Sequence, residues 1–150
     1  MPDETVLAFD FGTRRIGVAV GETMLKNARP LTTIAAEANA ARFEAIGRLI
    51  AEWQPARLVV GLPLALDGTE HEMTARSRRF ANQLQGRFGL PVEMTDERLS
   101  SAEAENRLRE HALRGRGTRH RKEAIDAEAA AVILQSYFDR TLHADTAARP

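Results

Sequence analysis

The sequence predicts an α/β protein whose mixed five-stranded sheet is covered by helices on both faces. Three strand-like segments follow one another at the N-terminus, and patterns typical of helices and strands then alternate. The short run Arg57–Leu62 (RLVVGL) is almost entirely apolar, as expected of a central strand that is buried on both sides. The length of 150 residues suits one domain. We therefore predict a single domain over residues 1–142, followed by a flexible tail at residues 143–150.

The first part of the chain predicts three consecutive strands. Residues 5–11 (TVLAFDF) and 15–22 (RIGVAVGE) are rich in strand-forming residues, and only the turn at residues 12–14 separates them. We expect these two segments to form a hairpin. Residues 30–34 predict a third, weaker strand.

Two amphipathic helices are predicted after these strands. The first covers about residues 38–53 and ends before Pro55, and the second covers about residues 70–88 and ends at Gly89. Their apolar stripes consist of Phe43, Ile46, Ile50 and Trp53 in the first helix and of Met73, Phe80, Leu84 and Phe88 in the second. Residues 91–97 predict the fifth strand.

The C-terminal third predicts two more helices. The spacing of Ser100 and Glu103 is that of a capping box, which predicts a helix from about residue 100 to residue 113. Residues 114–121 (RGRGTRHR) contain two glycines and predict a mobile loop, and the last helix is expected over about residues 122–140.

Composition and charge exclude several classes of protein. There is no cysteine, which excludes a thiol nucleophile and thiolate zinc sites. No apolar run approaches the roughly 18 residues that a membrane span needs, and the first residues lack the features of a secretory leader, so we expect a cytoplasmic protein. The net charge is zero, but residues 107–122 contain seven Arg or Lys and one Glu. Such a basic stretch attracts a phosphate backbone. The candidate nucleic-acid contacts in its loop are Arg114, Arg116, Arg119 and Arg121.

Three separated acids are candidates for a catalytic site. Asp10 lies near the end of an apolar strand, where a carboxylate is costly unless it is paired or bound to a cation, although it could simply cap the turn. Asp96 and Glu97 both end the fifth strand, and alternation alone does not decide which of them points inward. Asp126 lies at the predicted start of the last helix, on the same face as Ala129, Ala130 and Ile133. Its alternative role is a favourable interaction with the helix dipole.

Acids at the ends of several elements suit magnesium-dependent phosphodiester cleavage. Mg²⁺ prefers oxygen ligands, and two such ions can activate an attacking water and stabilise the leaving oxygen. This chemistry requires no protein nucleophile, in agreement with the absence of cysteine.

Four blocks of the sequence resemble the signature blocks of the YqgF/RuvX family. They are DFGTRRIGVAVGE (10–22), VVGLPLALDGTE (59–70), TDERLSSAEAE (95–105) and IDAEAAAVILQSYFD (125–139), and they occur in the order of the family over nearly the whole chain. Members of this family are described as pre-16S rRNA nucleases and as Holliday-junction-resolvase-like proteins. The resemblance implies a ribonuclease H-like fold and 5′-end maturation of 16S rRNA.

The resemblance also carries a site onto numbered residues of this chain. It implies that Asp10, Glu97 and Asp126 are the catalytic acids and bind Mg²⁺ or Mn²⁺, and it thereby favours Glu97 over Asp96. Arg15 and Arg98 match basic positions of the blocks and are candidate phosphate contacts. Asp67 matches an acid of the family whose role the sequence does not explain. The residues LSS at 99–101 are a mild departure, because threonine is common there.

Other functions compete with cleavage of precursor rRNA. A resolvase of four-way DNA junctions would use the same acids, and would need a two-fold dimer to cut two strands symmetrically. A non-catalytic assembly or transcription factor would use only the basic stretch at residues 107–122. An actin-like ATPase is a weaker alternative, because its fold needs two lobes and this chain holds one. The sequence leaves the choice between monomer and homodimer open, as well as the need for a ribosomal partner.

Overall fold

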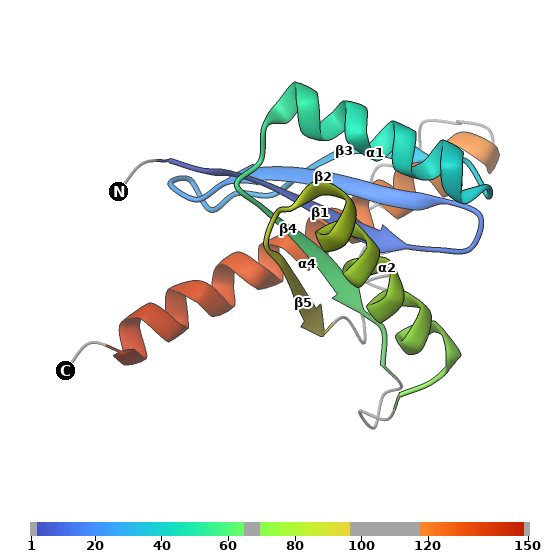
Figure 1. Ribbon diagram of the computed structural model, residues 1–150. Coiled ribbons are helices and arrows are strands. Elements are labelled where there is room, and N and C mark those ends of the chain that lie inside the picture. Colours follow the sequence, from blue (N-terminus) through green and yellow to red (C-terminus); the bar gives the residue numbers. More distant parts are fainter. Residues whose placement is uncertain (1–2, 65–69, 97–117, 149–150) are drawn as a thin grey trace.

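The computed structural model describes residues 3–64, 70–96 and 118–148, with side chains described for residues 123–140 of the last segment (Figure 1). The described elements follow one another along the chain as β1 (Thr5–Phe11), β2 (Ile16–Glu22), β3 (Arg29–Ile34), α1 (Asn39–Trp53), β4 (Arg57–Leu62), α2 (Glu72–Phe88), β5 (Val92–Asp96) and α4 (Thr118–Ala148). This order confirms the predicted strands and the two predicted central helices. The helix predicted at residues 100–113 lies outside the described residues.

The five strands form one mixed sheet in the order β3-β2-β1-β4-β5. β1, β2 and β3 pair antiparallel in sequence, whereas β4 pairs parallel with β1 and β5 pairs parallel with β4. The pairing of β2 with β3 shifts register between Val18 and Ala19. Since β1, β4 and β5 run in the same direction, they end at the same edge of the sheet, which we call the carboxyl edge.

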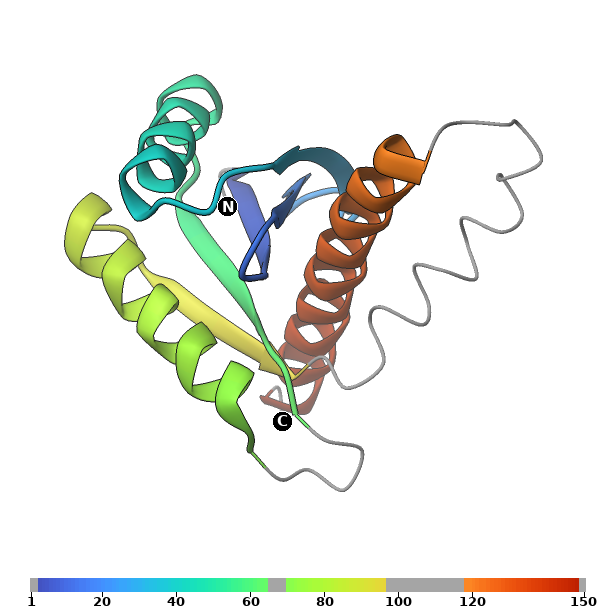
Figure 2. The same ribbon diagram turned by 90° about the vertical axis from the view of Figure 1, so that its right-hand side faces the viewer.

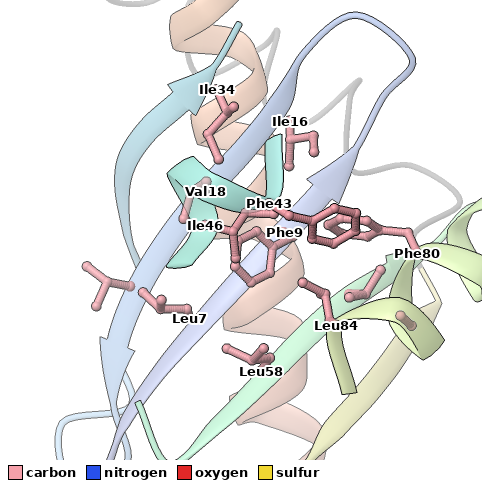
Figure 3. Packing of buried hydrophobic residues seen from close by; sticks show 13 residues of the cluster. Leu7, Phe9, Ile16, Val18, Ile34, Phe43, Ile46, Leu58, Phe80 and Leu84 are labelled. Atoms are coloured by element: carbon pink, nitrogen blue, oxygen red, sulfur yellow. The ribbon is translucent and has the colours of Figure 1, made fainter. Parts of the chain in front are cut away.

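One face of the sheet is covered by α1 and α2, and the opposite face is covered by α4 (Figure 2). On the first face, aromatic rings converge between strand and helices (Figure 3). The Phe80 ring of α2 lies 4.8 Å from the Phe11 ring and 6.0 Å from both the Phe9 and the Phe43 rings, measured between centroids. Phe80 therefore joins β1, α1 and α2 in one apolar cluster.

The second face packs small residues of the sheet against α4. Val6, Ala8 and Ala19 are fully buried there, together with Ala130 and Leu134 of the helix. A side chain at Gly21 would come within 2.7 Å of the Phe138 ring, so the helix lies close to β2. The apolar face predicted for the last helix is thus confirmed as the face that contacts the sheet.

The predicted bounds of the last helix are wrong. α4 begins at Thr118, directly after the second glycine of the predicted loop, and continues to Ala148 instead of ending near Arg140. The flexibility of residues 143–150 stays a prediction. In α2, Met73 is partly buried, and Thr74 and Ser77, which were not part of the predicted apolar stripe, are buried as well. Thr74 is buried because its hydroxyl accepts a hydrogen bond from the His71 amide and donates one to the Pro63 carbonyl, which ties the start of α2 to the chain after β4.

Within the described residues, no helix has both the length and the apolar character needed to cross a bilayer.

We predict that Phe80→Ala lowers the free energy of unfolding by about 3–5 kcal/mol, because the ring is only 3% exposed and its loss leaves a cavity between three elements. Urea denaturation measures the change. The control is Leu25→Ala, whose side chain is 71% exposed and should alter stability by less than about 0.5 kcal/mol. Equal effects of both variants would contradict the central position of Phe80.

Candidate active site

Asp10 lies near the carboxyl edge and belongs to the face that carries α4. Side chains alternate along a strand, so Asp10 points to the same side as Val6 and Ala8, which pack beneath α4. The turn that follows is tight, because a side chain at Gly12 would come within 2.5 Å of the Arg15 carbonyl oxygen. Asp10 thus lies at the edge of the sheet where the sequence analysis placed it, and its role as a metal ligand stays a prediction.

Gly17 brings the last helix onto the strand next to Asp10. It is the register partner of Asp10 across the β1–β2 pair. A Cβ atom at Gly17 would lie 1.9 Å from the carbonyl oxygen of Asp126 and 2.4 Å from its carbonyl carbon. The backbone of α4 therefore rests directly on Gly17. Two acids from opposite ends of the chain, Asp10 and Asp126, consequently occupy neighbouring positions on one face.

The Asp126 carboxylate forms an ion pair with Arg15. The Nε atom of Arg15 donates to Oδ2 of Asp126 over 2.5 Å, and the two side chains are 33% and 22% exposed. Arg15 was predicted to contact phosphate. In the described structure it contacts the candidate metal ligand instead.

The position of Asp126 in its helix also differs from the prediction. α4 begins at Thr118, so Asp126 lies two turns into the helix and not in its first turn. The influence of the helix dipole is confined to the terminal turn. The helix dipole therefore does not explain the position of Asp126. Its backbone contacts Gly17 and its carboxylate pairs with Arg15.

The end of β5 places Asp96 on the face of α1 and α2. Val92 and Met94 pack into the cluster beneath α1 and α2, and alternation puts Asp96 on that same side. Thr95 points the other way, where its hydroxyl accepts a hydrogen bond of 3.3 Å from Arg140 of α4. Asp96 is thus on the opposite face from Asp10. Glu97, the predicted third acid, lies outside the described residues.

The sequence analysis missed Arg42, a buried arginine that fixes the turn after Asp10. Its Nη2 atom donates to the Gly12 carbonyl over 2.7 Å and its Nε atom to the Ala36 carbonyl over 2.5 Å, while its guanidinium lies 5.4 Å from the centre of the Phe11 ring. Removal from water lowers the pKa of this guanidinium. Its position four residues before Ile46, on the apolar stripe of the helix, was the available signal.

The donor chemistry of the two placed acids suits a hard divalent ion. Carboxylate oxygens are the ligands that Mg²⁺ and Mn²⁺ take in proteins, and the Arg15 guanidinium already places a positive charge against one of them. Across the part of the chain that the structure describes, no group of three or more Asp, Glu, His or Cys side chains is close enough to hold a metal. A site with three acids would need one from outside the described residues, and Glu97 stays the predicted one.

The remaining predicted residues are not described, or only in part. Asp67, Arg98, Arg114 and Arg116 lie outside the described residues. Arg119 and Arg121 belong to the first turn of α4, and only their backbone is described.

We predict that Gly17→Ala lowers the free energy of unfolding by roughly 1–3 kcal/mol, because the added methyl group meets rigid helix backbone and α4 must shift. Urea denaturation measures this. The matched control is Gly86→Ala in α2, where nothing lies within 4 Å of the new atom. This control should raise stability by up to about 1 kcal/mol through helix propensity. A Gly17 variant as stable as the control would show that α4 does not rest on β2.

Known proteins are similar to this chain over nearly its full length. The model of the family described as "RuvX: Holliday junction resolvase" matches residues 4–140. A relative from Dechloromonas aromatica (strain RCB) is 58% identical over 139 residues, which are 93% of each chain. A relative from Bordetella parapertussis is also 58% identical, over 93% of this chain and 96% of its own. Both relatives bear the name "Putative pre-16S rRNA nuclease".

Solved structures share the fold at low sequence identity. Thermus thermophilus RuvC, in a structure described as "in complex with Holliday junction substrate", aligns with a TM-score of 0.50 and 17% identity. The alignment covers 93% of this chain and 96% of RuvC. A second structure of the same protein also gives a TM-score of 0.50. This likeness confirms the predicted ribonuclease H-like fold, and the family match and the relatives together show that the chain belongs to the RuvX family.

Proposed function

We propose that this protein is a metal-dependent endonuclease that processes the 5′ end of pre-16S rRNA during ribosome biogenesis. The observation that carries the proposal is the juxtaposition of Asp10 and Asp126 through Gly17, on one face at the carboxyl edge. In open α/β sheets, ligands bind beyond the carboxyl ends of the strands. The names of the relatives supply the substrate, and precursor rRNA would place the work of the protein in the cytoplasm.

In this proposal Asp10, Glu97 and Asp126 hold Mg²⁺ or Mn²⁺. When bound, the ions activate a water molecule and stabilise the oxygen that leaves the phosphodiester. The protein's own contribution is to keep the acids in place. Arg42 fixes the turn after Asp10, and Gly17 sets the distance of α4 from the sheet.

The basic residues would bind the nucleic acid. Arg98 and the arginines of the stretch at residues 107–122 would contact the phosphate backbone, which gives affinity that falls as salt rises. Because such contacts read charge and not sequence, they suit an RNA whose shape is recognised. A ribosomal partner could supply further selectivity, and the proposal requires no particular oligomeric state.

A second candidate function is resolution of four-way DNA junctions. It is favoured by the description of the family model, and the same acids would serve it. This activity would need two copies of the site related by a two-fold axis. The substrate therefore separates the two functions, whereas the acids do not.

We predict that Asp10→Asn reduces Mg²⁺-dependent cleavage by more than about 100-fold. Mutation of residues that only orient a metal ligand already lowers activity by about 10–100-fold, and a ligand itself should matter more. The variant should still fold, as judged by circular dichroism and thermal melting. The assay offers the purified protein a precursor 16S rRNA fragment and a four-way DNA junction in parallel, with Mg²⁺ and with chelator. Cleavage of the RNA alone supports the first function, and cleavage of the junction alone supports the second. Full cleavage by the Asp10→Asn variant would contradict both candidate functions. Binding of nucleic acid without cleavage by the wild-type protein would indicate an assembly factor.

We predict that Glu97→Gln abolishes the same cleavage, while Asp96→Asn preserves it. The two residues are adjacent, but Asp96 belongs to the face of α1 and α2 and so points away from Asp10. The pair is a matched test, because each variant removes one negative charge at the end of β5. The reverse result would assign the third ligand to Asp96 and would contradict the proposed geometry.

A further inference from the structure

Arg15 and Asp126 are each other's partners in the described structure. Their ion pair is the one hydrogen-bonded contact of either side chain within the described residues. It joins the beginning of β2 to the third turn of α4 and is the direct polar link between the β1–β2 turn and this helix. The pair is partly buried, so it is less screened by solvent than an exposed pair.

The guanidinium of Arg15 takes the position of a cation at Asp126. The Asp126 carboxylate belongs to the part of α4 that packs beside Asp10, on the same side of the sheet, and the guanidinium offsets its negative charge there. An arginine always carries its positive charge, so it offsets these acids at any physiological pH. A divalent ion bound to the same carboxylate would be repelled by the guanidinium, because both are positive.

We propose that Arg15 competes with the metal for Asp126, and that Arg15 leaves this carboxylate when a divalent ion binds. This inference rests on the proposed function, because it takes Asp126 as a metal ligand. The Arg15 carbonyl packs closely against Gly12 in the turn, so we assign the exchange to the side chain of Arg15 and not to its backbone. Once released, the planar guanidinium is free for the bidentate contact with a phosphate that arginine makes well. Metal binding would thereby prepare the protein for its substrate, and by linkage a phosphate held by Arg15 would raise the affinity for the metal.

Mn²⁺ binding to the purified protein tests the competition without any cleavage. Isothermal titration compares the wild-type protein with Arg15→Gln, which keeps a similar length but removes the charge. We expect Arg15→Gln to bind Mn²⁺ at least about fivefold more tightly, which corresponds to the upper range of a solvent-accessible ion pair. Arg15→Lys keeps the charge and should remain near the wild-type affinity. Metal-free Arg15→Gln should also melt a few degrees lower, and Mn²⁺ should restore more stability to it than to the wild-type protein.

The neighbouring Arg14 provides the matched control. Its side chain is 80% exposed and lies 3.8 Å from Glu37, so Arg14→Gln removes the same charge from the same turn without touching Asp126. It should change neither the Mn²⁺ affinity nor the melting temperature.

Two results would overturn the inference, and they are distinguishable. In the first result, Arg15→Gln binds Mn²⁺ as tightly as the wild-type protein or more weakly, and Asp10→Asn does not bind it. This result would support the metal site and refute only the competition. Mn²⁺ binding that is absent from the wild-type protein, or that persists when both Asp10 and Asp126 are replaced by Asn, would refute the metal site and the inference together. A tighter Arg14→Gln variant would show a general charge effect and would also overturn the specific role of Arg15.

Discussion

The close approach of α4 to β2 is the contact on which the candidate site depends. Gly17 has no side chain, and the backbone of the helix at Asp126 occupies the space that even a methyl group would need. Further along β2, Ala19 and Gly21 continue the same stripe of small residues beneath the helix. The small residues of β2 thus set the distance between sheet and helix, and with it the separation of Asp10 and Asp126.

Two arginines reinforce this arrangement from opposite faces of the sheet. Arg42 reaches the turn after Asp10 from the side of α1, and its hydrogen bonds go to backbone carbonyls. Arg15 reaches across to α4 and meets a carboxylate. The first is buried among apolar groups and acts as a fixed brace, whereas the second is partly exposed and is suited to exchange its partner.

The strands, the central helices and the helix face that carries Asp126 could be predicted from the sequence, because hydrophobic periodicity reflects which side chains are buried. The ribonuclease H-like fold came from the resemblance of four blocks, and the comparisons confirm it. Periodicity could not choose between Asp96 and Glu97, because the sequence alone does not show which helices cover each face of β5. It also missed Arg42 and the burial of Thr74, because both depend on backbone carbonyls contributed by other segments. The roles of the acids stay predictions.

The position of α4 after all five strands has a consequence for folding during synthesis. This helix packs on all five strands, and it follows all of them along the chain. A polypeptide that stops before residue 126 leaves the α4 face of its sheet largely uncovered and lacks one of the two placed acids. Proteins emerge from the ribosome in order from the N-terminus. The pair of acids therefore assembles only after residue 126 has been synthesised, so a product truncated before it would be less stable and unable to bring these two groups together.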